Sequence, residues 1–273
     1  MARLSNLPDW LIYSAALAIL LFAADTRRIK ADAPAPPPPV PGEETTPLSP
    51  LSPFNGAKIL KIPADSGRFA TAFSIGEPGV WLTAQNAVKD CVTLAVVLAP
   101  GRGAQAKVTA VPGGQLAVMT TEGGAAPLPI APGAHGHEDS FIAGFPQGQA
   151  GEAAVRLLGA SFKGDHRRFN PTEPELDWAE IGRTDGLKGP LVGLEGAPVL
   201  DGLGRVQGVL IGEAPRRGRM AAAPISAIRQ AMALAKVTPI TQADSEPITT
   251  DNYGRAADAL RRDLRVAQIW CGG

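Results

Sequence analysis

Few residues in this 273-residue chain have the types and spacing that carry chemistry. The clearest cluster is His135-Gly136-His137-Glu138-Asp139, because a His-x-His pair with nearby acids can bind zinc. Proline, glycine and alanine surround this cluster, as in a connecting loop, and no third ligand is evident elsewhere in the sequence. The sequence therefore predicts a solvated loop here, with no metal site and no cofactor.

The only two cysteines are Cys91 and Cys271, which are too few for a cysteine-based zinc site. Their positions alone fit one disulfide or two inert thiols equally well. The formal net charge is zero and the chain has no stripe of basic side chains, so nucleic acid is not an expected partner.

Short strands are the elements expected to position any site. The chain has 31 glycines, 26 prolines and only 5% aromatic residues, a balance typical of many short strands joined by tight turns. Apolar runs broken by glycine and proline recur from Gly56 to Val237, and ten or eleven strands at this spacing predict an all-β barrel or sandwich. The candidate strands are Arg68–Ile75, Val80–Thr83, Val92–Leu98, Ala106–Val111, Leu116–Thr120, Ser140–Gly144, Val155–Phe162, Leu176–Ile181, Pro198–Leu200, Val206–Ile211 and Arg219–Ala223.

Two helices and one more strand are expected after this run of strands. Apolar residues recur at helical spacing from Ile225 to Ala235, and again on one face from Ala256 to Leu264. Arg261 and Arg262 are interpreted as the solvent face of the second helix. Val266–Cys271 alternates like a strand. Its residues on one face are Ala267, Ile269 and Cys271.

An uncharged apolar run, Trp10–Ala24, lies near the N-terminus; at about 15 residues it is short for a membrane-spanning helix and long enough for a signal-peptide core. A small-x-small cleavage site is poor here, so residues 1–30 are predicted to be an uncleaved signal anchor, with a cleaved signal as the alternative. Arg27, Arg28 and Lys30 follow the run, and the positive-inside tendency alone would leave the body of the chain in the cytoplasm.

Residues 31–55 are dense in proline, which fixes φ and has no N–H to donate. Such a segment is typical of an extended, semi-rigid linker, and the twenty residues from Pro34 to Pro53 would hold a domain about 60 Å from a membrane. This linker favours an extracytoplasmic location for the body, against the charge tendency.

Three stretches, in this order, resemble the trypsin-like serine peptidases, including their bacterial envelope members. Val80–Val88 looks like the family's LTA-x-H-x-V segment, and Gly114–Met119 looks like its D-(L/I)-A-(V/L)-(L/I) strand. Gly193–Asp201, the third stretch, looks like G-x-S-G-(G/S/A)-P-V. Between the second and third stretches, Phe141–Gly148 also resembles the family's GxP-G strand and turn. The resemblance implies a trypsin-like double β-barrel over residues 56–240, with a C-terminal helix and a tail of helix and strand over residues 241–273.

The three catalytic positions of that family carry other residues here: the histidine falls on Asn86, the aspartate on Gln115 and the serine on Glu195. In the triad mechanism a hydroxyl attacks the carbonyl, an imidazole carries its proton and a carboxylate orients the imidazole. Asn86 cannot titrate near neutral pH, Gln115 has no charge, and the Glu195 carboxylate is a poor acyl-transfer nucleophile without a base. A shifted alignment finds no substitute, since no histidine precedes His135 and the Gly193–Asp201 turn has no serine or cysteine.

The turn around Glu195 keeps the glycines and proline of the family's motif. The resemblance implies that the N–H groups of Gly193 and Glu195 form an oxyanion-hole-like, anion-binding nest. We expect the Glu195 carboxylate to fold back and occupy this nest.

The resemblance also bears on the cysteines. In many trypsin-like domains a cysteine just after the catalytic histidine is bridged to a neighbouring strand, and Cys91 lies five residues beyond Asn86. The neighbouring strand, near Phe69–Ile75, has no cysteine, so a disulfide from Cys91 to Cys271 is expected, with two buried thiols that never meet as the alternative. Such a bond would require an oxidising compartment.

Together these observations predict a non-catalytic trypsin-like domain, a pseudoprotease, tethered to a membrane on its periplasmic or extracytoplasmic side. Its expected role is to bind a protein or peptide, or to act as a scaffold, in the cell envelope. Two other interpretations stay open: a peptidase with a rearranged active site, and a structural subunit that only packs against its neighbours in an envelope assembly.

Overall fold

The structure, a computed structural model, describes residues 29–30, 54–63, 66–76, 79–110, 114–135, 138–164, 171–214, 218–242 and 246–273. The apolar run Trp10–Ala24 and the proline-rich stretch Pro34–Pro53 lie outside these residues. Within the described part of the chain, no helix is long and apolar enough to cross a membrane. The described strands form two sheets of seven strands each.

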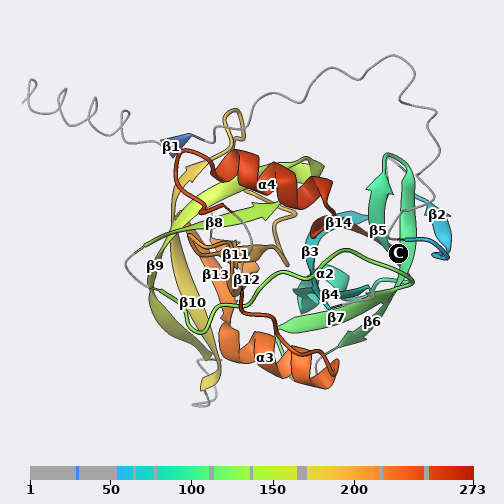
Figure 1. Cartoon of the computed structure of the whole chain (residues 1–273), viewed down its shortest axis with the longest axis horizontal. Helices are drawn as coiled ribbons and strands as arrows, with labels where there is room; N and C mark the ends of the chain where they lie inside the picture. Colours follow the sequence, from blue (N-terminus) through green and yellow to red (C-terminus); the bar gives the residue numbers. More distant parts are fainter. Residues whose placement is uncertain are drawn as a thin grey trace, which may run out of the picture.

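The first sheet closes into a six-stranded barrel, with β2 added at its edge (Figure 1). The strand order is β2-β6-β5-β14-β3-β4-β7, and pairing of β6 with β7 closes the circle. The strands are β2 (Ile59–Lys61), β3 (Arg68–Gly76), β4 (Val80–Ala84), β5 (Thr93–Ala99), β6 (Arg102–Ala110), β7 (Leu116–Thr121) and β14 (Val266–Gly272). Trp81, Val96 and Met119, one from each of β4, β5 and β7, lie in its buried core.

β14 completes this barrel although it follows all the other strands in the chain. It lies antiparallel between β3 and β5, so that Ile269 is opposite Ala70 on one side and Val96 on the other. Its alternation buries Ala267, Ile269 and Cys271 in the barrel core. The tail is therefore an integral strand of the barrel, because it satisfies the backbone of two strands that would otherwise each have an open edge.

The second sheet is also a closed six-stranded barrel, since β9 pairs with β10 as well as with β8. The short β1 lies parallel to β10 outside this circle. The strands are β1 (Ile29–Lys30), β8 (Asp139–Gly144), β9 (Gly151–Gly164), β10 (Pro171–Arg183), β11 (Pro198–Leu200), β12 (Val206–Ala214) and β13 (Arg219–Pro224). β9 and β10 extend beyond the runs predicted from the sequence, because their long hairpin continues past the barrel core with β-bulges.

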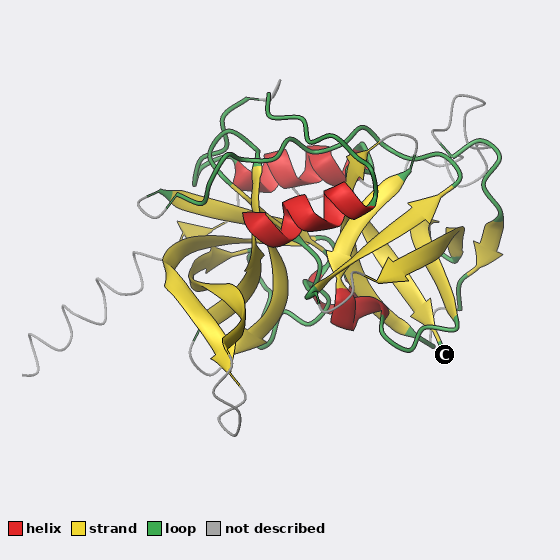
Figure 2. Ribbon diagram, turned by 90° about the horizontal axis from the view of Figure 1, so that it is seen from below, coloured by secondary structure: helices red, strands yellow, loops and turns green. Residues whose placement is uncertain are grey.

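Two longer helices hold the barrels together. α3 (Ile225–Leu234) packs on β7 of the first barrel and on β12 and β13 of the second, while α4 (Tyr253–Arg262) packs on β8, β9 and β14. Figure 2 shows the barrels side by side with these helices at the seam between them. One buried cluster accordingly joins the barrels, with Phe73 from the first, Val209 from the second and Ile228 from α3.

The interpretation of Arg261 as a solvent-facing residue of α4 is wrong. Its side chain is only 8% exposed, and Nη2 donates to Glu152 Oε2 at 2.8 Å, where the Glu152 side chain is 2% exposed. Arg261 Nη1 also donates to the Gly151 carbonyl oxygen at 3.0 Å. The arginine is buried because a buried carboxylate on β9 needs a cation.

Candidate functional site

Asn86 lies on the short helix α2 (Gln85–Val88), directly after β4 of the first barrel. Its Nδ2 donates a hydrogen bond to the Ile211 carbonyl oxygen of β12, 3.0 Å away in the second barrel. Because the amide is neutral, it can donate this bond but cannot accept and return a proton during a reaction. In this structure, Asn86 is a contact between the barrels.

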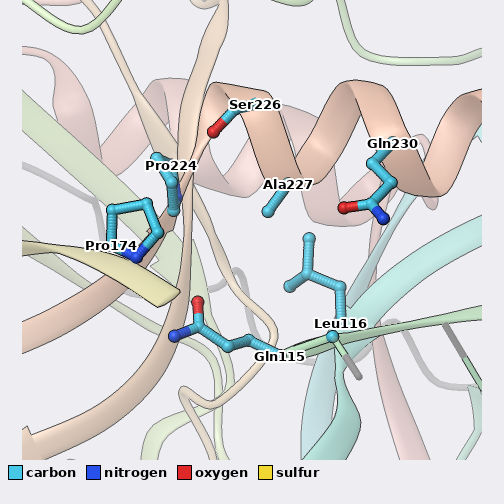
Figure 3. A pocket seen from close by; sticks show the side chains of 8 residues that line it. Gln115, Leu116, Pro174, Pro224, Ser226, Ala227 and Gln230 are labelled. Atoms are coloured by element: carbon cyan, nitrogen blue, oxygen red, sulfur yellow. The ribbon is translucent and has the colours of Figure 1, made fainter. Parts of the chain in front are cut away.

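Gln115 lies immediately before β7 and next to α2, since the Gln85 N–H donates to the Gln115 carbonyl oxygen at 2.8 Å. Its Nε2 donates to Glu175 Oε1 of β10 at 3.2 Å, which again crosses from one barrel to the other. The side chain also lines a pocket of about 120 Å³ together with Pro174 and Ser226 (Figure 3). That volume is below the range of about 300–1,000 Å³ typical of small-molecule sites.

The turn that carries Glu195 depends on glycine. Gly196 has a φ of +86°, and a Cβ there would lie 2.1 Å from both the Thr71 carbonyl oxygen and Thr83 Oγ1. Gly193 has a φ of +102°, and its carbonyl oxygen accepts a hydrogen bond from Thr71 Oγ1 at 2.8 Å. Only glycine combines these backbone angles with so close an approach to β3 and β4, so the turn is pressed against the first barrel.

The Glu195 carboxylate folds back onto its own turn. Glu195 Oε2 accepts a hydrogen bond from the Gly193 N–H at 2.9 Å. This N–H is one of the two that the sequence resemblance assigns to an anion-binding nest. A bond between an ionised acceptor and a backbone N–H is about twice as strong as a neutral one, so the carboxylate competes well with an outside ligand for this donor.

Side chains from three elements hold the loop that leads into this turn. Gln147 Nε2 donates to the carbonyl oxygens at both ends of residues 188–190, at 2.7 and 2.8 Å, and Arg183 Nη1 donates to the carbonyl oxygen between them at 2.7 Å. Glu213 Oε2 accepts from the Leu191 N–H at 2.8 Å. These four backbone groups of the loop are therefore already hydrogen-bonded to side chains of the same chain.

Glu213 and Glu195 share one electrostatic environment. Burial raises the pKa of Glu213 above its ordinary value, and the negative charges of Glu180 and Glu195 raise this pKa further. The Leu191 N–H and the Arg183 guanidinium act in the opposite direction. Arg183 is itself held by Glu180, whose hydrogen bond raises the Arg183 pKa. Among the charged groups that act on Glu213 in the described part of the chain, two carboxylates, those of Glu180 and Glu195, therefore oppose one arginine, Arg183.

Cys91 and Cys271 are joined by a disulfide, with their Cα atoms 5.3 Å apart and a sequence separation of 180. Cys271 lies on β14, and Cys91 lies between α2 and β5. The bond therefore fixes the strand that completes the first barrel to the segment that follows Asn86.

The histidine cluster considered for zinc is only partly within the described residues, since residues 136–137 lie outside them. The His135 N–H donates to Gln207 Oε1 at 2.9 Å, and Asp139 pairs with Arg156. Over the part of the chain that the structure describes, no group of three histidine, cysteine, aspartate or glutamate residues could hold a metal ion.

No protein-family model and no curated protein matches this sequence. Solved structures do match, among them the Rv3671c protease from M. tuberculosis in its active form. It is 20% identical over 71% of this chain and 83% of that chain, with a TM-score of 0.50. The chain has a trypsin-like serine protease fold. Two further similar structures are the MamO protease domain from Magnetospirillum magneticum (14% identity, 66% and 94% covered, TM-score 0.47) and the HtrA-type protease AlgW with a decapeptide (16%, 61% and 51%, 0.46).

In this trypsin-like fold, the three residues selected from the sequence lie where the barrels meet. Asn86 and Gln115 reach from the first barrel into the second, and the Glu195 carbonyl oxygen accepts from the Thr71 N–H of β3 at 3.0 Å. Among the hydrogen bonds of the described residues, none joins two of the three side chains. The structure therefore brings the three positions to one interface without connecting them as a relay.

Sequence reasoning missed Gln147, Arg183 and Glu213. Each acts on a loop that is distant in sequence, so periodicity could not reveal the contact. The only signal was positional: Glu213 comes two residues after the buried run Val206–Ile211, at the end of a strand, where a carboxylate can reach a neighbouring loop.

Proposed function

We propose that this chain is a catalytically inactive trypsin-like domain that binds a protein or peptide partner and acts as a scaffold from a membrane-tethered position in the cell envelope. The observation that carries this proposal is the set of hydrogen bonds that the triad-equivalent side chains make within the fold. Asn86 and Gln115 donate hydrogen bonds across the barrel interface, and Glu195 accepts one from its own turn. All three stabilise the fold.

The charge at the turn supports the loss of catalysis independently. Acyl transfer needs donors that stabilise the negative charge developing on the carbonyl oxygen. Here the Gly193 N–H already binds the Glu195 carboxylate, and Glu213 adds a second acidic group nearby. An oxyanion at this position would be repelled by the Glu195 carboxylate. Replacing Glu195 with serine would free the Gly193 N–H, but Asn86 and Gln115 would still supply neither the base nor its orienting carboxylate, so a serine alone would not create an active site.

The test is covalent labelling of the full chain with a fluorophosphonate probe, together with casein digestion. We expect no labelling and no digestion. The matched control is the triple variant Asn86→His, Gln115→Asp, Glu195→Ser, which restores the three residue types in the same fold. Labelling of the unmodified chain within the Gly193–Asp201 turn would overturn the proposal.

The proposed location rests on the linker and on the cysteine pair. A disulfide persists in oxidising compartments such as the periplasm and is rare in the cytoplasm. Cys91 and Cys271 should therefore resist alkylation in protein taken from its native cells without reductant. Two free thiols under those conditions would contradict the extracytoplasmic assignment.

A further inference from the structure

The disulfide between Cys91 and Cys271 presents its two cysteines unequally to the outside. Cys91 is half-buried, in the short segment between α2 and β5, whereas Cys271 is 4% exposed and packs in the core of the first barrel. The residues on both sides of Cys91 are exposed, and Val92 is exposed by 84%. An external thiolate therefore reaches Cys91 more readily than Cys271, and attack at Cys91 makes Cys271 the leaving group.

Burial opposes the departure of Cys271, because a thiolate that leaves there loses contact with water. One cation offsets this cost. Arg68 lies directly opposite Cys271 across the pair of β3 and β14, and its Nη2 donates to Cys271 Sγ at 3.5 Å. The same Nη2 donates to the Lys89 carbonyl oxygen at 2.5 Å, which holds the guanidinium beside the disulfide. Arg68 therefore supplies positive charge where a thiolate on Cys271 would form.

The other charged side chains of this segment are Lys89 and Asp90, which are adjacent, exposed and opposite in sign. Their effects on the disulfide oppose each other. Among the hydrogen bonds of the described residues, Arg68 is the only charged side chain that contacts Cys271. Strand register and side-chain contact thus agree on the residue that can stabilise the leaving sulfur.

We propose that this disulfide is an exchange site, at which Cys91 bonds transiently to a thiol of a dithiol protein and Arg68 stabilises Cys271 as the leaving thiolate. The external thiolate attacks Cys91 Sγ, the bond between Cys91 and Cys271 breaks, and its electron pair leaves with Cys271. The second thiol of the partner then displaces Cys91. The dithiol is oxidised by two electrons, the cysteine pair is reduced, and the protons of the two partner thiols pass to Cys91 and Cys271.

The reverse sequence forms the bond from the two thiols of this chain and the disulfide of the same kind of partner. Cys91 again carries the mixed disulfide, and Cys271 attacks it as the thiolate beside Arg68. This inference does not depend on the proposed binding role, because none of the triad-equivalent residues takes part in the exchange.

The first test identifies the sulfur that is attacked. The oxidised full chain is treated briefly with reduced glutathione, quenched with iodoacetamide and digested for mass spectrometry. In molecules that have exchanged once, we expect glutathione on Cys91 and the alkyl group on Cys271. The chain unfolded in urea is the control, and it should carry glutathione on either cysteine. Glutathione mainly on Cys271, or an equal division in the folded chain, would overturn the proposal.

The second test measures how fast dithiothreitol reduces the folded chain. Arg68→Met should slow reduction about threefold or more, because the leaving thiolate loses its adjacent cation, and Arg68→Lys should restore part of the rate. Arg102→Met is the matched control and should leave the rate unchanged. Arg102 is an exposed arginine of β6 that lies opposite Ala99, at the other end of β5 from Leu94, the residue opposite Cys271.

The direction of the change separates the proposed role of Arg68 from a structural one. A variant that only loosened the fold would expose the disulfide and be reduced faster, so lost stability does not explain slower reduction. An unchanged or faster rate in Arg68→Met, or equal slowing in Arg102→Met, would refute the role of Arg68.

Discussion

Replacing Arg261 by methionine should destabilise the protein far more than the same change at its neighbour Arg262. Methionine keeps much of the apolar stem of the side chain but removes the cation that faces Glu152 at 2.8 Å. The Glu152 side chain is 2% exposed, and its remaining side-chain partner is the Thr184 hydroxyl, which donates to Oε1 at 2.8 Å. A carboxylate is then left buried without its counter-charge.

Removing one partner of a buried ion pair costs about 3–5 kcal/mol, because the remaining charge keeps its desolvation penalty. Arg262→Met should change stability by less than about 0.5 kcal/mol, as expected for an exposed side chain. Urea unfolding of the full chain measures both values, provided that the slope with denaturant is unchanged.

The double variant Arg261→Met, Glu152→Gln separates the buried charge from the lost contacts. The neutral amide can keep the Thr184 hydrogen bond and carries no uncompensated charge, so the double variant should be more stable than Arg261→Met alone. If Arg261→Met lowers the free energy of unfolding no more than Arg262→Met does, or if the double variant recovers no stability, then an uncompensated charge on Glu152 does not explain the effect of removing Arg261.

Three further predictions concern the disulfide, the acidic loop contact and the turn. Replacing Cys91 and Cys271 with alanine should lower the free energy of unfolding by up to about 5 kcal/mol, from loop entropy over the 180-residue separation, with unchanged stability of the reduced and oxidised protein as the contrary result. Burial raises the pKa of Glu213, so the folded chain holds the proton of this carboxyl more tightly than the unfolded chain does. The contribution of Glu213 to the free energy of unfolding is therefore fully present below the ordinary pKa and is lost as pH rises through the pKa of the folded state. Glu213→Gln should flatten this part of a profile of stability against pH, and an identical profile would refute the assignment. Gly196→Ala should lower the free energy of unfolding by about 2 kcal/mol or more. A Cβ added at Gly212 would meet nothing within 4 Å, so Gly212→Ala should cost much less in the same urea assay.

Much of the fold could be predicted because strands and turns leave local signals. Short apolar runs between glycines and prolines marked most of the barrel strands, and the alternation of Val266–Cys271 identified the face that is buried in the first barrel. The role of β14 as the closing strand could not be read locally, since it depends on which two strand edges are left open. Arg261 was expected on the solvent face because arginine is usually an exposed residue. It lies four residues after Ala257, on the buried side of α4.

The residues of the candidate site also fall into those that a local motif identifies and those that only the fold brings together. Asn86, Gln115 and Glu195 could be located because the motifs around them are continuous in sequence. Their partners Ile211 and Glu175 lie more than fifty residues away, so no spacing rule connects them. The contact between Glu213 and the Leu191 N–H escaped for the same reason, since the two residues are 22 positions apart in sequence.

The order in which the strands are synthesised has a consequence for biogenesis. The edges of β3 and β5 that receive β14 leave the ribosome long before it, as the sequence separation of 180 between Cys91 and Cys271 illustrates. At translation rates of 5–20 residues per second, that interval is roughly 10 to 40 seconds, during which the two strands that will flank β14 present unpaired backbone. The nascent chain should therefore depend on a holding chaperone during that interval, and ribosome-stalled chains that end before Val266 should aggregate or bind such a chaperone, whereas chains that include β14 should not.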